Sequence, residues 1–271
     1  MKYAVLYSKK DEAGLNIAEQ LKNHFLPQVT IIELAKETIF SENIDEKDEQ
    51  LAKVDFIIFA TKHQSKENRN TLSLHAPGNW RNADFGGKPG KVCPTSCLAL
   101  KFLFEKMAEN IAESKLNYEL TLESTHHGPL INKPCCFIEI GTTLEQWQDP
   151  LAGKIIAKTI SDFQNFDSWK NKEKNKDIKS AIGLGGPHYC SNFNKIQLSF
   201  LSNVALGHII PEYAFPLTES LLQEAIIKHH EHITHVIMDW KGCGNSESRQ
   251  KILDLLKKFN LEVIRSDQIK K

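Results

Sequence analysis

Histidines recur in this sequence directly after short apolar runs. His63, His126, His127 and His188 each follow such a run within a few residues. Ligands of open α/β sheets collect beyond the carboxyl ends of the strands, so we expect these four side chains to lie near one another. The segments that contain them read Ala60-Thr-Lys-His63, Glu123-Ser-Thr-His-His-Gly-Pro129 and Gly183-Leu-Gly-Gly-Pro-His188.

Carboxylates accompany these histidines and complete a set that suits zinc. Glu123 opens the segment that contains His126, and Glu139 closes another apolar run. Neutral imidazoles with a carboxylate are typical ligands of Zn²⁺, and a catalytic zinc keeps one position open for water. Such a metal lowers the pKa of bound water to about 7 and polarises a carbonyl, so an ester or amide can be hydrolysed without a nucleophilic side chain. Zn²⁺ is therefore the predicted cofactor, although any one of these histidines alone is more simply a surface or hydrogen-bonded residue.

Nucleophilic catalysis has less support. The sequence lacks a Gly-x-Ser-x-Gly elbow; Ser96 is better explained as a helix cap, and Cys97 is a weak nucleophile candidate. The six cysteines are expected to be reduced, since no secretion signal precedes them.

The histidines between 229 and 235 are given a structural rather than a metal-binding role. They lie mostly at a predicted helix end, where a histidine interacts favourably with the helix dipole.

The glycines before His188 predict a close approach by a ligand. Gly183-Leu-Gly-Gly186 is neither a Walker loop nor a full dinucleotide fingerprint. A bare backbone at Gly185 and Gly186 would still allow amide groups to face a phosphate or an oxyanion.

Alternating strand and helix patterns must position these residues. The helix that follows the first strand is expected to share Leu15, Ala18, Leu21 and Phe25 on one face. Asp149-Pro150 is typical of a helix start. The runs 29–34 and 54–60 read as strands buried on two sides. Further strand patterns cover 3–7, 118–122, 136–140, 180–184, 196–200, 203–210, 235–239 and 261–264, and further helix patterns cover 96–113, 218–229 and 245–259.

This order predicts an αβα layered fold with a mixed, largely parallel sheet, as one catalytic domain over residues 1–271. Two long loop insertions interrupt it. Residues 61–95 are polar, rich in glycine and proline and aperiodic, which favours a functional loop, and residues 166–177 form a lysine-rich surface connection.

The composition is that of an ordinary globular protein. The 271 residues are 41% hydrophobic and 25% charged with a formal net charge of zero, which argues against nonspecific coating of nucleic acid. Lysines and arginines concentrate in 62–91 and 170–179, either as solvated loops or as a phosphate-contacting rim. No stretch approaches the ~20 apolar residues of a membrane span, so a cytoplasmic location is expected.

Taken together, the loops resemble the archaeal- and plant-type D-aminoacyl-tRNA deacylase family. The resemblance runs in order along most of the chain, and its second and third segments are specific as a set. The matching segments are Ala60-Thr-Lys-His63, Thr71-Leu-Ser-Leu-His-Ala-Pro-Gly-Asn-Trp80, Glu123-Ser-Thr-His-His-Gly-Pro129, Ile138-Glu-Ile-Gly-Thr142 with Trp147, and Gly183-Leu-Gly-Gly-Pro-His-Tyr189.

The resemblance implies a monomeric, zinc-dependent hydrolase that cleaves the ester between a D-amino acid and the 3′ acceptor end of tRNA. Its core would be similar to those of peptidyl-tRNA hydrolase and nucleoside phosphorylase. No membrane and no obligate protein partner are implied. A related hydrolase or phosphorylase activity, or a non-catalytic tRNA-binding module, remain alternatives.

Roles follow from this hypothesis. His63, His126 and His188 are the predicted metal ligands, and Glu139, Glu123 and His127 would act on or around the attacking water. The predicted substrate contacts are His75, Trp80 as a stacking surface, Lys62, Gly185 and Gly186.

Overall fold

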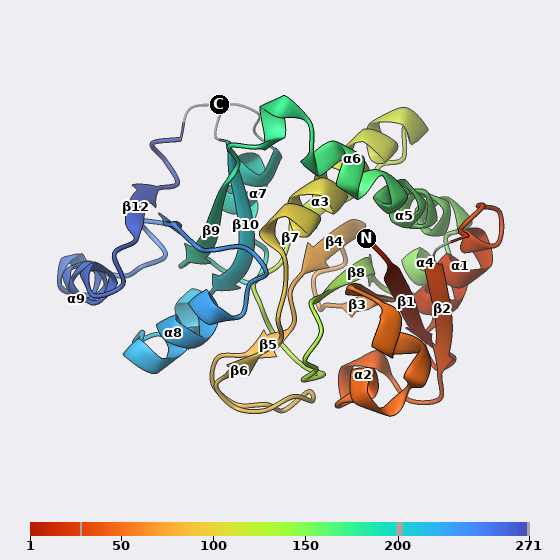
Figure 1. Ribbon diagram of the computed structural model, residues 1–271, viewed down its shortest axis with the longest axis horizontal. Helices are drawn as coiled ribbons and strands as arrows, with labels where there is room; N and C mark the ends of the chain where they lie inside the picture. The colour runs from red at the N-terminus through yellow and green to blue at the C-terminus, as the bar shows by residue number, and fades with distance from the viewer. Residues whose placement is uncertain (28, 199–202, 270–271) are drawn as a thin grey trace.

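Two sheets form the framework of the protein in a computed structural model that describes residues 1–27, 29–198 and 203–269 (Figure 1). The larger sheet has the strand order β2-β1-β3-β8-β4-β7, and the smaller has the order β10-β9-β11-β12. The first comprises β1 (Tyr3–Ser8), β2 (Val29–Leu34), β3 (Phe56–Gln64), β4 (Thr71–His75), β7 (Glu119–Leu122) and β8 (Cys135–Thr142). The second comprises β9 (Lys179–Leu184), β10 (Val204–Ile210), β11 (His235–Met238) and β12 (Glu262–Arg265).

The sheets are largely parallel, as the sequence predicts. Strands β2, β1, β3 and β8 run parallel, β4 is antiparallel to β8, and all pairs of the second sheet are parallel. Strand β3 is buried over most of its length, but the expectation that β2 is buried on two sides was wrong. Since β2 is an edge strand, Ile31 stays 42% exposed.

Helix α3 (Cys97–Ser114) connects the two sheets physically. It packs with α5 (Pro150–Asp162) beside the first sheet and against β10 of the second, and Figure 1 shows it crossing between them. Both helices begin as the sequence predicts, because Ser96 and Asp149 accept hydrogen bonds from the first turns.

The buried face of α1 (Glu12–Leu21) differs in part from the predicted one: Ala18 and Leu21 are buried as predicted, but the other two positions are not. Leu15 is 41% exposed, and Phe25 lies beyond the helix end and is 85% exposed. Ile17 is buried instead. Gly14 faces the sheet so closely that a Cβ there would meet the carbonyl oxygen of Ala60 at 2.9 Å, which sets the rotation of the helix.

Residues 191–198 form helix α7 rather than the strand predicted for 196–200, of which 199 and 200 lie outside the described residues. Phe193, Ile196 and Gln197 are buried on one face of this helix. The Gln197 side chain accepts from the backbone N–H of Leu206 at 2.8 Å and donates to the carbonyl oxygen of Leu206 at 3.2 Å. This tertiary contact with β10 favours the helix.

Both predicted loop insertions contain secondary structure. Residues 61–95 include the end of β3, all of β4, and the small strands β5 (Gly78–Asn79) and β6 (Lys91–Val92). Residues 166–177 include α6 (Phe166–Lys170), whose Phe166 and Trp169 are buried against Phe102. The sequence pattern missed these elements because the strands are short or irregular and the helix is a single aromatic turn.

The remaining helices lie around these sheets. They are α2 (Ile44–Lys47), α4 (Leu144–Trp147), α8 (Glu219–Ile227) and α9 (Ser246–Lys257). The 3-10 turns are η1 (Thr38–Phe40), η2 (Glu49–Lys53), η3 (Phe163–Asn165), η4 (Glu173–Asn175) and η5 (Glu212–Ala214). Asn245 caps α9 as predicted.

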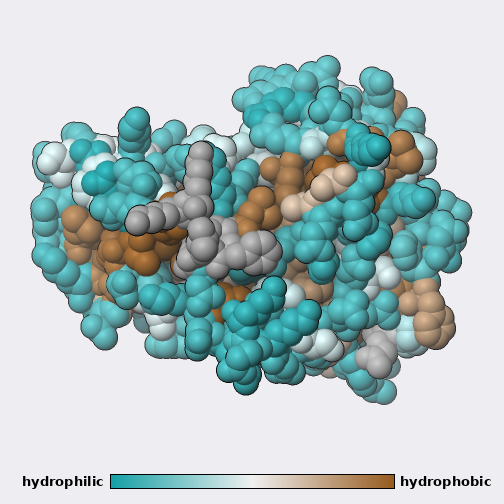
Figure 2. All heavy atoms as spheres, turned by 90° about the horizontal axis from the view of Figure 1, so that it is seen from above, coloured by the Kyte–Doolittle hydropathy of each residue, from teal (hydrophilic) through white to brown (hydrophobic). Residues whose placement is uncertain are grey.

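One buried apolar cluster extends through both sheets. It includes Val5 and Ile58 of the first sheet, Phe104 of α3, and Ile182 and Val236 of the second. Hydrophilic side chains cover most of the face seen in Figure 2, with apolar side chains visible between them. Among the described residues, no helix is long and apolar enough to cross a membrane.

Candidate metal centre and active site

Five histidines and two glutamates converge where the first sheet meets the loop after β9. We call this group the histidine–glutamate cluster: His63, His75, Glu123, His126, His127, Glu139 and His188. His63 and His75 lie at the ends of β3 and β4, and Glu139 lies in β8. The other members lie in loops, so sheet and loops together build the site.

Strand register explains why distant residues meet. In the parallel pair β3 and β8, Thr61 is opposite Glu139, and in the antiparallel pair β4 and β8, Ser73 is opposite Glu139. His63 and His75 are two residues further along their strands, and alternate residues share a face. The backbone N–H of Glu123 continues the sheet by donating to Leu74 at 3.2 Å.

The two glutamates connect the histidines and are themselves buried, at 1% and 2% exposure. Glu123 contacts His63 Nδ1 at 3.2 Å and His188 Nε2 at 3.0 Å. Glu139 contacts the same His63 Nδ1 at 3.2 Å and His75 Nε2 at 3.6 Å. His63 Nε2 in turn contacts the hydroxyl of Tyr189 at 2.9 Å. Each carboxylate therefore bridges at least two imidazoles.

Adjacent His126 and His127 both face the cluster because of an unusual backbone conformation. An extended chain would point them to opposite sides, but His127 has φ +45°, in the left-handed region. Their ring centroids are 4.3 Å apart. The backbone N–H of Gly78 stabilises this turn by donating to the carbonyl oxygens of His126 at 3.2 Å and His127 at 2.7 Å.

Three imidazoles present Nε2 to the cluster. Nδ1 of His75 is 3.2 Å from the carbonyl oxygen of Ala76, that of His126 is 2.8 Å from Ser124, and that of His127 is 2.6 Å from Gly128. A carbonyl oxygen only accepts, so each Nδ1 carries a hydrogen. This arrangement fixes the orientation of each ring, as outer hydrogen bonds commonly do for metal-ligating histidines.

The cluster divides its histidines by protonation. Burial lowers the pKa of His63, but its close contacts with the carboxylates of Glu123 and Glu139 outweigh this effect and raise the pKa to about 11. The pKa of His75 is raised in the same way, because its contact with Glu139 outweighs the effect of burial. Burial, followed by the charge of His75, lowers the pKa of His126 well below its usual value and that of His127 to about 4.

Burial raises the pKa of both glutamates, but their histidine partners reverse that effect. Close ion-pair contacts with His188 and His63 hold the pKa of Glu123 well below its usual value. Close contacts with His63 and His75 lower the pKa of Glu139. Both groups are therefore carboxylates at neutral pH, the form that ligates metals.

The donor set fits a metal ion. Three combinations bring one ligand atom from each residue within 4.8 Å of the others: His75 with His126 and His127, His63 with Glu123 and His188, and His75 with Glu123 and Glu139. His75 Nε2, both Glu123 oxygens and Glu139 Oε2 are buried, and although each lies in a close ion-pair contact of the cluster, none has a hydrogen bond of good geometry among the described residues. The first combination groups His126 with His75 and His127, whereas the sequence analysis grouped it with His63 and His188.

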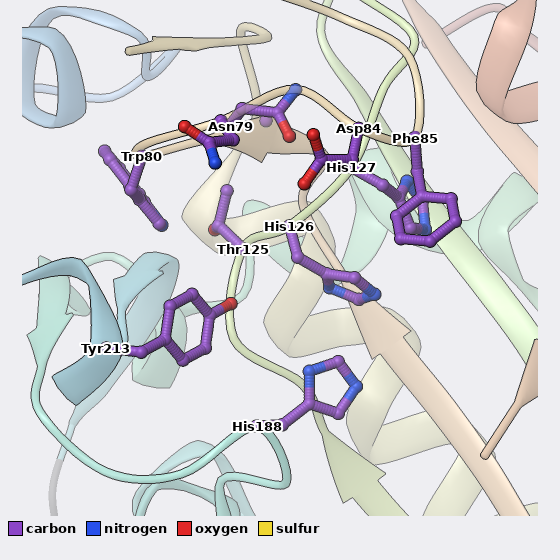
Figure 3. A pocket seen from close by; sticks show the side chains of 11 residues that line it. Asn79, Trp80, Asp84, Phe85, Thr125, His126, His127, His188 and Tyr213 are labelled. Atoms are coloured by element: carbon purple, nitrogen blue, oxygen red, sulfur yellow. The ribbon is translucent and has the colours of Figure 1, made fainter. Parts of the chain in front are cut away.

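A pocket of about 250 Å³ opens over His126, His127 and His188. One wall is formed by Gly78, Asn79, Trp80, Asn82, Asp84 and Phe85, and another by Tyr213 of η5. In Figure 3, His126 and His188 lie between Tyr213 on one side and Phe85 on the other. A ligand in this pocket contacts the cluster directly.

Two other side chains predicted to contact the substrate, Lys62 and Trp80, pack against protein groups. Lys62 contacts Glu37 at 3.6 Å and lies 5.3 Å from the ring centroid of Trp147, away from the cluster. Trp80 lines the pocket but is 3% exposed and packs edge-on against His208, so base stacking stays a prediction that requires the ring to be uncovered.

Gly185 and Gly186 have positive φ values, but protein rather than open space surrounds Gly185. A Cβ at Gly185 would meet the Asp239 carbonyl oxygen and Cys243 Sγ, both at 2.9 Å. Instead, these glycines position other residues. The N–H of Gly185 donates to Ile210 at 2.8 Å, and the carbonyl oxygen of Gly186 accepts from Glu212 at 3.0 Å, next to Tyr213.

The two basic segments, 62–91 and 170–179, do not form a common rim around the site. Within 62–91, Lys62, Arg69 and Lys91 are in ion pairs with glutamates. The segment 170–179 precedes β9, whereas His188 follows it. Six residues of strand, roughly 20 Å, separate the two ends.

Several pocket residues escaped the sequence analysis. Asn79, Asp84, Phe85, Thr125 and Tyr213 line the pocket, and Tyr189 contacts His63. Thr125 and Tyr189 directly adjoin the predicted histidines, a signal that could have identified them. Tyr213 carries no such signal, because tertiary structure alone brings it to the pocket.

Known proteins resemble this chain over nearly its whole length. A family model described as D-aminoacyl-tRNA deacylase matches residues 50–264. The D-aminoacyl-tRNA deacylase of Pyrococcus abyssi is 33% identical over 280 residues, covering 96% of this chain and 98% of its own. That of Methanocaldococcus jannaschii is 32% identical over 259 residues, covering 93% and 95%.

A solved structure has the same fold. The crystal structure of AF0625, a conserved protein of unknown function, superposes with a TM-score of 0.87 at 29% identity and covers 99% of this chain and 96% of its own. The family match and the near-complete coverage of the relatives together show that the chain belongs to the D-aminoacyl-tRNA deacylase family.

Proposed function

We propose that this protein hydrolyses the ester between a D-amino acid and the 3′ end of tRNA, with Zn²⁺ held by the histidine–glutamate cluster. The observation that carries the proposal is the pocket whose base consists of His126, His127 and His188. An ester carbonyl bound there lies against the cluster. The family to which the chain belongs supports the hydrolytic reaction and tRNA as the substrate.

Two of the three combinations contain at least two imidazoles and are best suited to hold zinc: His75, His126 and His127 through their Nε2 atoms, and His63, Glu123 and His188. Zn²⁺, when bound, polarises a carbonyl and lowers the pKa of water to about 7. Glu139 belongs only to the third combination, with His75 and Glu123, and its buried Oε2 has no hydrogen bond of good geometry among the described residues, although it lies 3.2 Å from His63 Nδ1. It can orient a water molecule or His75.

The walls of the pocket support selection between enantiomers. Its volume of about 250 Å³ is small for an aminoacylated nucleotide, so a side chain on the wrong side of the α-carbon would meet protein atoms. Only one enantiomer then presents its carbonyl to the cluster while its side chain points to free space.

Purified protein tests this proposal with D- and L-aminoacyl-tRNA, before and after treatment with a chelator, together with metal analysis. We expect release of D-amino acids, loss of activity with the metal, and recovery on addition of Zn²⁺. His126→Ala should abolish turnover, whereas His232→Ala, at an exposed position, serves as a matched control. An active metal-free protein would rule out the role of zinc.

Other substrates separate the alternatives. Turnover of peptidyl-tRNA in place of D-aminoacyl-tRNA, or phosphate-dependent release of a base from a nucleoside, would replace the proposed substrate. Binding of tRNA without any turnover would reject the enzyme. The proposal includes a monomeric state, which sedimentation of the purified protein tests.

A further inference from the structure

Two side chains of opposite charge adjoin the pocket over the cluster, one near each of its aromatic sides. At one end, Asp84 lines the pocket next to Phe85, whose carbonyl oxygen accepts from the N–H of Gly128 at 2.9 Å. At the other, Arg81 does not itself line the pocket, but its neighbours Trp80 and Asn82 do, and its Nη2 donates to the carbonyl oxygen of Pro216 at 2.6 Å, three residues beyond Tyr213. Arg81 and Asp84 are exposed, and neither forms an ion pair with another described residue. Both charges are therefore available to a ligand.

Each end also has an exposed aromatic ring. Phe85 is 65% exposed and Tyr213 is 55% exposed. The Tyr213 hydroxyl lies 3.5 Å from Ser124 Oγ, close to the loop that carries His126. Aromatic rings stack on nucleic-acid bases without regard to sequence, so the rings alone do not set the direction of a bound substrate. The charges do.

The proposed substrate is itself polarised about the ester. On one side is the amino acid with its ammonium group, and on the other the terminal adenosine with the phosphate that joins it to the rest of the tRNA. Because the ester must lie at the histidines in the middle of the pocket, the two parts extend toward opposite ends. Asp84 attracts the ammonium group and repels phosphate, and Arg81 does the reverse.

We propose that Arg81 and Tyr213 form the subsite for the terminal nucleotide, with the guanidinium group on its phosphate and the phenol ring against its base. The aminoacyl group then points toward Asp84 and Phe85. This assignment rests on the proposed deacylase function. It makes Arg81 and Tyr213 determinants of tRNA binding rather than of the choice between amino acids.

Hydrogen bonds hold both ends at fixed positions relative to the cluster. Asn79 Nδ2 donates to the carbonyl oxygen of Gly86 at 2.8 Å and closes residues 79–86 into a compact loop. The turn that carries Tyr213 is joined to Gly186, two residues before His188, by the Glu212 N–H. The proposed subsite is thus part of the same framework as the histidines.

Removal of the phosphate from the substrate isolates the contribution of Arg81. Two small substrates are compared: the D-aminoacyl ester of adenosine at its 3′ oxygen, and the same ester carrying a 5′ phosphate. We expect Arg81→Gln to lower kcat/KM about tenfold for the phosphorylated ester, typical of one lost charge-assisted hydrogen bond, and to leave the other unchanged. Lys88→Gln is the control, since Lys88 is an exposed cation of the same loop, but neither it nor its neighbours Gly87 and Pro89 line the pocket.

Full-length D-aminoacyl-tRNA provides a second measurement for Arg81. Each phosphate contact on a single strand contributes about 0.7 to the slope of log affinity against log salt. At subsaturating substrate, the slope for kcat/KM should therefore become shallower by about that amount in Arg81→Gln. It should stay unchanged in Lys88→Gln.

Substitutions at Tyr213 test the stacking contact. Tyr213→Ala should lower kcat/KM for both small esters about tenfold, mainly through KM, as expected for loss of one base stack. Tyr213→Phe retains the ring and should restore activity.

The outcomes separate this subsite from the function on which it rests. If Arg81→Gln affects both esters equally, or affects neither, Arg81 does not bind the phosphate and the assignment is overturned. If Asp84→Asn, but not Arg81→Gln, discriminates between the two esters, the substrate lies in the opposite direction. If the wild-type protein cleaves neither ester nor D-aminoacyl-tRNA, the deacylase function itself fails.

Discussion

Before any metal binds, the buried charges of the cluster nearly balance. The carboxylates of Glu123 and Glu139 oppose His63 and His75, whose pKa values are raised, while His126 and His127 stay neutral. A metal ion that binds Nε2 of His75 must displace its proton, because a ligating imidazole is neutral there. Metal uptake at this site should therefore release protons and weaken as the pH falls.

Glu123 is the residue whose loss should matter most within the cluster. It is 1% exposed and contacts three imidazoles, His63, His126 and His188. Glu123→Gln keeps the shape of the side chain but removes the charge that supports those contacts. We expect zinc affinity and kcat/KM to fall about 10- to 100-fold, as for other partners of metal-ligating histidines.

Metal content and deacylation, measured side by side, check this prediction. Glu119→Gln is the matched control, since Glu119 lies four residues earlier, is largely exposed and pairs with Arg69. A Glu123→Gln protein that binds zinc and turns over like the wild type would show that the carboxylate is dispensable.

The types of residue in the site could be read from the sequence, but their grouping could not. The positions of histidines and glutamates at strand ends predicted that His63, Glu123, Glu139 and His188 would lie in one site, but not which of them would form a set of metal ligands. The left-handed conformation of His127, which turns two consecutive rings to one side, has no signature in the residue types around it. Tyr213 is 86 residues from His127 in the chain, and local patterns carry no information on such contacts.

At the scale of elements, His208 of β10 joins the second sheet to the site. Its Nδ1 accepts from the hydroxyl of Thr125 at 3.0 Å, next to His126, and its Nε2 donates to the carbonyl oxygen of Cys93 at 2.9 Å. The side chain is fully buried. Burial, followed by the charge of neighbouring His229, lowers the pKa of His208 well below its usual value.

This neutral histidine predicts loss of stability in mild acid. In the unfolded chain His208 takes up a proton as the pH falls through about 6.5, whereas in the folded protein it does not, so the free energy of unfolding falls below that pH. One such residue contributes a slope of about 1.4 kcal/mol per pH unit. Denaturant unfolding of chelator-treated protein between pH 7 and 5 should therefore show a shallower dependence in His208→Gln.

His232→Gln provides the comparison, because His232 is exposed and its replacement should leave the slope unchanged. Equal slopes in all three proteins would mean that His208 binds its proton in the folded state as well.

Elements with strong local signals were predicted well, and those formed by tertiary contacts were not. The caps Ser96, Asp149 and Asn245 fixed three helix starts correctly. The alternation along 196–198 favoured a strand, yet the contacts of Gln197 with β10 hold a helix there. Strand β4 was missed within an aperiodic stretch because it pairs with β8 and β7, both more than 40 residues away in the chain.

At the scale of the whole molecule, the shared apolar cluster predicts cooperative unfolding. Residues of both sheets and of α3 belong to one buried cluster, so neither sheet can lose its packing without exposing the other. We expect a single transition, with fluorescence and circular dichroism coinciding, in chelator-treated protein. Two separated transitions would show that the single-domain organisation predicted from the sequence is wrong.

The loops that form the cluster also set an order of assembly during synthesis. His63, His75, Glu123, His126, His127 and Glu139 all leave the ribosome before His188, and β10, which holds Thr125 through His208, follows later still. A nascent chain that ends before residue 188 contains the three imidazoles of one set but lacks a ligand of the other. The complete centre can therefore form only at a late stage of translation.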